Sequence, residues 1–127
     1  MEHGPDTARL LESINRSRFT QELIIDRLNI TSMPALPPNL TDITITSTHL
    51  KTLPALPPTL RFLICLRNEL TALPDLPNLR HLDCSNNQLT TLPALPGSLL
   101  ELICGRNPLT ALPALPPTLE YLSCNNT

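Results

Sequence analysis

Four cysteines recur at a nearly constant interval, and their chemistry has to be considered first. They are separated by 19, 20 and 20 residues, and each lies in a phrase of the form Leu-x-Cys. Cysteines placed in this way could act as nucleophiles, zinc ligands, disulfide partners or buried thiols. The four are Cys65, Cys84, Cys104 and Cys124.

Their spacing favours buried thiols. A nucleophile has to be accessible, whereas an earlier copy of the phrase holds Ile45 at this position, which indicates the core. Zinc ligands cluster in a tetrahedron and often form Cys-x2-Cys pairs, whereas these cysteines follow one another in a row. On adjacent strands their Cα atoms would lie about 4.8 Å apart, but parallel Cβ vectors would keep the Cβ atoms beyond the disulfide mean of about 3.8 Å. We therefore expect a ladder of reduced thiols and a reducing compartment.

A second set of candidate residues consists of His81, Asp83 and Glu101, whose side chains are of the types used in metal and acid–base sites. We expect them on the outer face of neighbouring strands. An open sheet face offers no enclosed pocket to shift their pKa values. The sequence therefore predicts no metal, no cofactor and no catalytic site, so that this chain is not expected to be an enzyme.

The elements that position these residues repeat about every 20 residues. A strand phrase, such as Leu60–Leu70, alternates with a proline phrase, Leu-Pro-x-Leu-Pro, such as Leu53–Pro57. Earlier and weaker copies start at Met33 and at Leu23. Self-similarity at this period is the signature of a leucine-rich repeat solenoid, conventionally grouped with the α/β folds.

Each repeat should place a short parallel strand on the concave face of the solenoid. In Leu63-Ile64-Cys65 alternate side chains point inward, and the asparagines that follow, such as Asn68, can satisfy backbone groups where the chain turns. The proline phrase favours an extended convex return rather than a helix.

The N-terminal residues carry a different pattern. Leu10, Leu11 and Ile14 fall at helical spacing over residues 6–18, with Asp6 or Thr7 as a cap, which predicts a short helix covering the first repeat. We therefore divide the chain into an N-terminal tail and capping helix, residues 1–19, and about five to six repeats, residues 20–127. No capping sequence follows Cys124, so we expect either a chain truncated at its C-terminus or self-association through the open last repeat.

The complete repeat, Leu-Pro-x-Leu-Pro-x-x-Leu-x-x-Leu-x-(Cys or Val)-x-x-Asn-x-Leu-Thr, resembles the bacterial leucine-rich repeats of type III secreted effectors of the YopM and IpaH kind. The resemblance covers residues from about 20 to 127. It implies a virulence protein whose repeats bind host proteins, located in the host cytoplasm if it is an effector and otherwise in the bacterial cytoplasm. In the IpaH branch such repeats precede a separate ubiquitin ligase domain with a catalytic cysteine, which nothing here matches. The alternative function is therefore the recognition segment of such a ligase.

Partner binding is expected on the outward side chains of the strands, because these side chains do not pack in the core. Exposed apolar and aromatic residues that are grouped on one face favour a protein contact surface, although they could also shield one another. A net charge of −2 without a basic run argues against nucleic acid, and no apolar stretch is long enough to span a membrane. The predicted partner-binding residues are Phe62, Ile64, Leu66, His81, Asp83, Glu101, Ile103 and Tyr121.

Overall fold

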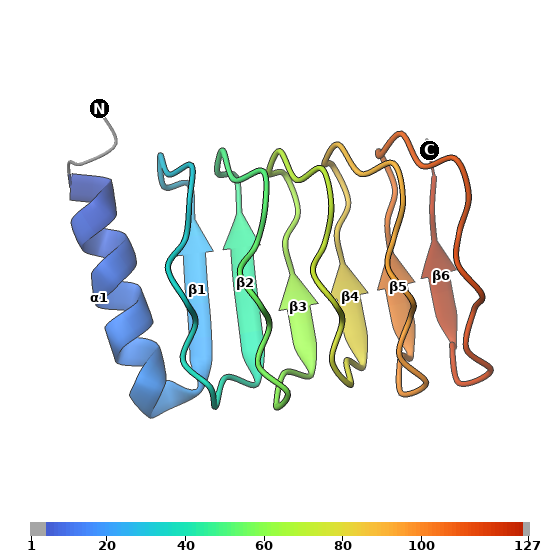
Figure 1. Ribbon diagram of the computed structural model, residues 1–127, viewed down its shortest axis with the longest axis horizontal. Helices are drawn as coiled ribbons and strands as arrows, with labels where there is room; N and C mark the ends of the chain where they lie inside the picture. Colours follow the sequence, from blue (N-terminus) through green and yellow to red (C-terminus); the bar gives the residue numbers. More distant parts are fainter. Residues whose placement is uncertain (1–4, 126–127) are drawn as a thin grey trace.

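A computed structural model of the chain, which describes residues 5–125, shows one helix followed by a sheet of six parallel strands (Figure 1). The strands pair in chain order, so each repeat adds one strand to the edge left by the previous repeat. The predicted leucine-rich repeat solenoid is confirmed. Its elements are α1 (Pro5–Thr20), β1 (Glu22–Asp26), β2 (Asp42–Thr46), β3 (Phe62–Ile64), β4 (His81–Asp83), β5 (Glu101–Ile103) and β6 (Tyr121–Ser123).

The core is a stack of leucine and isoleucine layers between the strands and the return segments. The central residues of β3, β4 and β5, which are Leu63, Leu82 and Leu102, are fully buried. Residues on either side of them point outward, as the two-residue period of a strand requires. Each layer is completed only by its neighbours, so stability comes from stacking.

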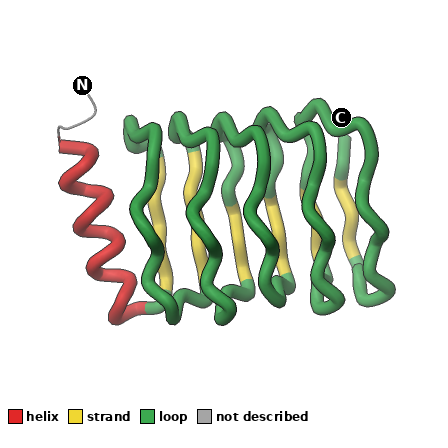
Figure 2. The backbone as a smooth tube through the Cα atoms, viewed as in Figure 1, coloured by secondary structure: helices red, strands yellow, loops and turns green. Residues whose placement is uncertain are grey.

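The return segments are loops without helix or strand, and they run along the side opposite the sheet (Figure 2). In three repeats a turn closes with a hydrogen bond over three residues, for example from Leu60 N–H to the Pro57 carbonyl at 3.1 Å. In the repeat that lacks one residue, Leu79 N–H instead donates to the Pro77 carbonyl at 2.7 Å. The missing residue is therefore absorbed in the turn, which leaves the strand register intact.

A ladder of buried asparagines holds the carboxyl ends of the strands. Asn87 Oδ1 accepts a hydrogen bond from Leu70 N–H at 3.1 Å, and its Nδ2 donates to the carbonyls of Cys65 and Cys84 at 2.9 and 3.0 Å. Nδ2 of Asn68 and of Asn107 donates the equivalent bonds one repeat away on either side. Asn107 Oδ1 likewise accepts from Leu89 N–H at 3.1 Å, whereas Asn68 Oδ1 accepts from Thr48 N–H at 3.0 Å. The amides satisfy backbone groups at the turns, as the sequence predicted, and each also joins two adjacent repeats.

Helix α1 covers the first strand with Leu10 and Ile14, both nearly fully buried. The helix begins at Pro5, so Asp6 already lies in its first turn. Its carboxylate accepts a hydrogen bond from the backbone N–H of Asn29 at 2.6 Å. The predicted role of Asp6 as an N-terminal cap is therefore wrong, since its carboxylate joins the helix to the first repeat.

The prediction of four reduced thiols is wrong for two of them. Cys104 and Cys124 form a disulfide, whereas Cys65 and Cys84 are free and buried. The Cα atoms of the bonded pair are 4.9 Å apart, within the range that disulfides span. The side chains turn toward one another, which the assumption of parallel Cβ vectors did not allow. The expectation of a reducing compartment loses its basis, because it depended on all four thiols being free.

The two ends of the stack differ within the described residues. Leu23 of β1, next to the helix, is 1% exposed, whereas Leu122 of β6 is 41% exposed at the equivalent position. Leu112 and Leu115 of the last return segment are exposed as well. The last repeat therefore lacks the apolar cover that every earlier repeat has.

Candidate functional site

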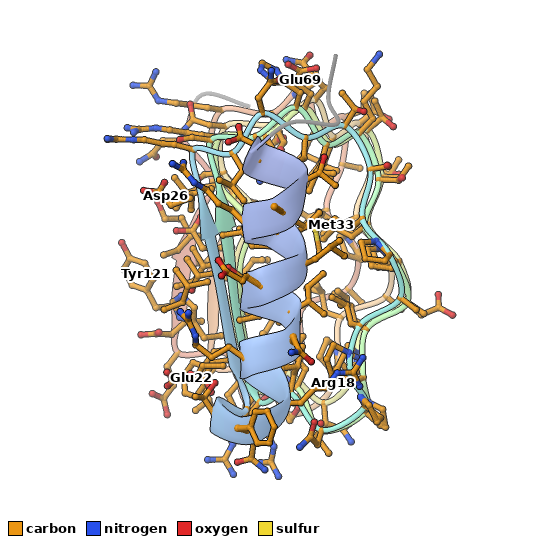
Figure 3. The ribbon with its side chains drawn as sticks, turned by 90° about the vertical axis from the view of Figure 1, so that its left-hand side faces the viewer. Arg18, Glu22, Asp26, Met33, Glu69 and Tyr121 are labelled. Atoms are coloured by element: carbon orange, nitrogen blue, oxygen red, sulfur yellow. A yellow bond between two sulfur atoms is a disulfide. The ribbon has the colours of Figure 1, made fainter. Side chains whose placement is uncertain are left out.

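The concave face has two columns of outward positions that cross the six strands, and a third that lies on β1 and β2 and then directly beyond the ends of β3–β6. The register aligns Phe62 with His81 and Ile64 with Asp83. In a view along the stack, Glu22, Asp26 and Tyr121 lie on the strand side, opposite Met33 on the proline side (Figure 3). The columns are Glu22, Asp42, Phe62, His81, Glu101 and Tyr121; Ile24, Thr44, Ile64, Asp83, Ile103 and Ser123; and Asp26, Thr46, Leu66, Ser85, Gly105 and Asn125.

The predicted apolar contacts are brought to this face, and they differ in exposure. Phe62 is 42% and Tyr121 is 53% exposed, whereas Ile64, Leu66 and Ile103 are half-buried. The Phe62 and His81 rings lie 6.3 Å apart between centroids and are tilted by 36°. Phe62 and its strand neighbours thus form one apolar group, while Tyr121 lies three strands away.

The polar candidates on the face are engaged with one another rather than gathered into a reactive centre. His81 Nδ1 lies 2.6 Å from Glu101 Oε1, and Asp83 Oδ1 accepts hydrogen bonds from the N–H and hydroxyl of Ser85 at 3.1 and 2.7 Å. Within residues 5–125, no three His, Cys, Asp or Glu side chains come together as metal ligands would. The described face is suited to non-covalent contact.

Ile24 and Phe19 are further exposed apolar residues that the predicted partner-binding set does not include. Ile24, on β1, is 63% exposed and belongs to the same column as Ile64. Its register was readable from the repeat, so the signal was available. Phe19, near the end of α1, is 84% exposed, and the repeat pattern carries no information about it.

Arginines border the face where the strands end. Arg27, Arg67 and Arg106 each directly follow the third column, and all three have positive φ, near 60°. This left-handed backbone turns the chain away from the sheet. Arg61 and Arg80 lie at the opposite margin, and both are exposed. Arginines therefore border both margins of the strands.

Comparison with known proteins identifies the repeats. A family model described as leucine-rich repeats in two copies matches residues 58–97. A Shigella effector leucine-rich repeat domain superposes with a TM-score of 0.91 at 36% identity, covering 96% of this chain and 57% of that domain. The leucine-rich effector protein YopM from Yersinia pestis superposes with a TM-score of 0.87 at 37% identity, covering 94% of this chain and 35% of YopM. No curated protein matches significantly in sequence.

The fold and the repeated sequence together define a leucine-rich repeat domain, which is a non-catalytic module for protein interaction. Its repeats are similar to those of the Shigella effector domain and of YopM, which confirms the resemblance predicted from the sequence. A second YopM structure, from Yersinia enterocolitica, superposes with a TM-score of 0.66 at 34% identity, covering 95% of this chain and 32% of that one.

The chain spans about 57% of the length of the Shigella domain and about 35% of that of YopM from Yersinia pestis. Between residues 5 and 125, no helix has the length and apolar character needed to cross a membrane.

Proposed function

We propose that this chain is the target-binding part of a secreted bacterial virulence effector, and that its concave face binds a host protein. The observation that carries the proposal is the exposure of two aromatic residues on this face. Phe62 lies in the repeat that also carries half-buried Ile64 and Leu66, and Tyr121 lies on the strand next to half-buried Ile103. Aromatic residues that stay accessible on a rigid surface are preferred anchors in protein interfaces. The similarity to two bacterial effector proteins supports a host protein as the target.

In this proposal the repeats, residues 20–127, carry recognition, and α1 covers their N-terminal end. The polar residues His81, Asp83 and Glu101 contribute orientation, because their hydrogen bonds to neighbours fix them in place. The protein would act in the host cytoplasm after type III secretion.

The test is affinity capture from a host cytosolic lysate with the parent chain and with a Phe62→Ser, Ile64→Ser variant. We expect a host protein that the parent retains and the variant loses. Leu11→Ser is the matched control, because Leu11 is 54% exposed on α1, outside the concave face. Retention by all three chains, with melting unchanged, would refute the concave face as the binding surface.

The ubiquitin ligase alternative uses the same surface, so the capture experiment does not separate the two functions. What distinguishes them is chemistry on the captured partner. If the gene continues past Thr127 into a helical domain with a catalytic cysteine, the longer protein should transfer ubiquitin to that partner. A longer protein that binds the partner and leaves it unmodified would exclude the ligase function.

A further inference from the structure

The charge of the concave face is of one sign. Five of its residues carry a carboxylate, and none of its positions carries Lys or Arg. The arginines lie outside the columns, at both margins. The five acidic residues are Glu22, Asp26, Asp42, Asp83 and Glu101.

Glu101 Oε1 lies 2.6 Å from His81 Nδ1, whereas no strong ion pair neutralises the other four carboxylates within the described part of the chain. Asp26 and Asp42 accept hydrogen bonds from the hydroxyls of Thr46 and Thr41 at 2.6 and 2.8 Å, which are neutral donors. Asp26 also lies 4.0 Å from Arg27, with both side chains exposed, so that contact is weak. Glu22 and Asp42 are register partners on adjacent strands, where like charges repel. The face therefore has uncompensated negative charge.

The acidic residues lie on both sides of the apolar group on β3. Glu22 of β1 and Glu101 of β5 are each two strands away from Phe62, in the same column. At about 4.8 Å per strand, each lies about 10 Å from Phe62 along the stack. An extended chain advances about 3.3 Å per residue, so this distance corresponds to about three residues of a segment lying across the strands.

The area of the face limits the size of the partner. Six strands at about 4.8 Å span about 24 Å, which with about 13 Å across the columns gives on the order of 300 Å² before side-chain relief. A standard interface buries about 800 Å² on each partner. The part of the face that these six strands form is therefore matched to a short segment.

Taking the proposed concave-face function as its basis, we infer that the target segment is extended and both basic and apolar. An apolar side chain packs on Phe62 and Ile64, and a Lys or Arg about two or four residues away on each side, which lies on the same face of the extended segment, pairs with the acidic residues of β1–β2 and of β4–β5. The arginines at the two margins favour the same placement of the segment's cationic side chains. They repel cations at the edges and keep them over the middle of the face.

The experiment is selection from a displayed library of random peptides of about 12 residues, long enough to cross the face when extended. We expect enriched peptides with Lys or Arg on both sides of an apolar residue, and binding that weakens as salt rises. Neutralising Glu22 and Asp42 together, as Glu22→Gln and Asp42→Asn, should weaken a selected peptide by about five- to tenfold. The pair Glu12→Gln and Asp75→Asn makes the same charge change at exposed positions off the face and should change affinity less than about twofold.

The other outcomes separate this inference from the proposed function. Enriched peptides without Lys or Arg that still require Phe62 would overturn the inference and leave the concave-face function standing. Acidic peptides that depend on Arg67 and Arg106 would move the binding site to the margin and overturn the inference. Peptides indifferent to Phe62→Ser, or no enrichment at all, would count against both.

Discussion

At the scale of single residues, the cysteines show how position in the stack sets chemistry. Cys65 and Cys84 occupy the same register as the bonded pair, yet both are free and fully enclosed. Burial raises the pKa of the Cys84 thiol to about 12, and the nearby Asp83 carboxylate adds to the shift. Burial also raises the pKa of Cys65 well above its ordinary value. Cys84 and then Asp83 make smaller contributions in the same direction. Both thiols are protonated and unreactive at neutral pH.

This burial predicts a loss of stability in alkaline solution. A folded-state pKa above the unfolded value means that the folded chain holds the proton more tightly. The contribution is fully present below the ordinary thiol value of 9.0 and is lost as the pH rises toward about 12. We expect the free energy of unfolding by urea to fall as the pH rises above about 9 toward about 12, and to fall less in a Cys65→Val, Cys84→Val variant.

Valine is a suitable replacement because the equivalent position of β2 holds the buried Ile45. The disulfide of Cys104 and Cys124 is kept in both proteins, so it does not contribute to the difference. An identical pH dependence for parent and variant would show that other groups cause the loss of stability in alkaline solution.

At the scale of the repeat, the asparagine of each turn contributes to the stability of two repeats, because its amide bonds to the backbone of both. Replacing Asn87 by Ala removes its hydrogen bonds and leaves Leu70 N–H and the Cys65 carbonyl without that partner in a buried site. Each unsatisfied buried group costs about 1–3 kcal/mol, so we expect a loss of about 2–4 kcal/mol in the free energy of unfolding. Chemical denaturation measures it.

The neighbouring Gln88 provides the control for that substitution. Its side chain is exposed, so Gln88→Ala should change stability by less than about 0.5 kcal/mol. Similar effects of the two substitutions would mean that solvent replaces the amide of Asn87, and that the asparagine ladder contributes little.

Much of each repeat could be predicted from the sequence, because one residue pattern fixes several features at once. The Leu-x-Cys phrase predicted the strand and its buried side, and the asparagine predicted the turn. The proline phrase predicted that the chain returns between strands as an extended segment without a helix. Gly105 illustrates what the pattern does not contain. A Cβ atom there would lie 2.7 Å from the backbone oxygen of Asn125, a contact that depends on how closely two repeats approach.

The candidate site was predictable in its columns and less so in its contacts. Register follows from counting residues, so Phe62, Ile64 and Tyr121 could be placed on one face before the structure was known. The 2.6 Å contact between His81 and Glu101 and the bonds of Asp83 to Ser85 depend on rotamers, which a repeat period does not specify. The prediction that Cys104 and Cys124 are free thiols was wrong for the same reason, because a disulfide depends on the rotamers of its two side chains.

At the scale of the whole molecule, the stack behaves as a row of layers whose neighbours decide their stability. Leu23, Leu82 and Leu122 occupy equivalent positions at the start, middle and end of the row. Helix α1 keeps Leu23 at 1% exposure and both neighbouring repeats keep Leu82 at 0%, whereas Leu122 is 41% exposed. The same leucine is therefore expected to contribute differently according to its place.

Truncating each of these leucines to Ala tests whether the helix replaces a repeat. Leu82→Ala should cost about 3 kcal/mol, because it leaves a cavity between two repeats, and Leu122→Ala should cost about 1 kcal/mol or less, because solvent already reaches the side chain. Leu23→Ala discriminates between two views of α1. A cost near that of Leu82→Ala, measured by urea denaturation, means that the helix closes the stack as fully as a repeat does. A cost near that of Leu122→Ala would mean that the helix lies on the first strand without sealing it, and that both ends of the solenoid are energetically open.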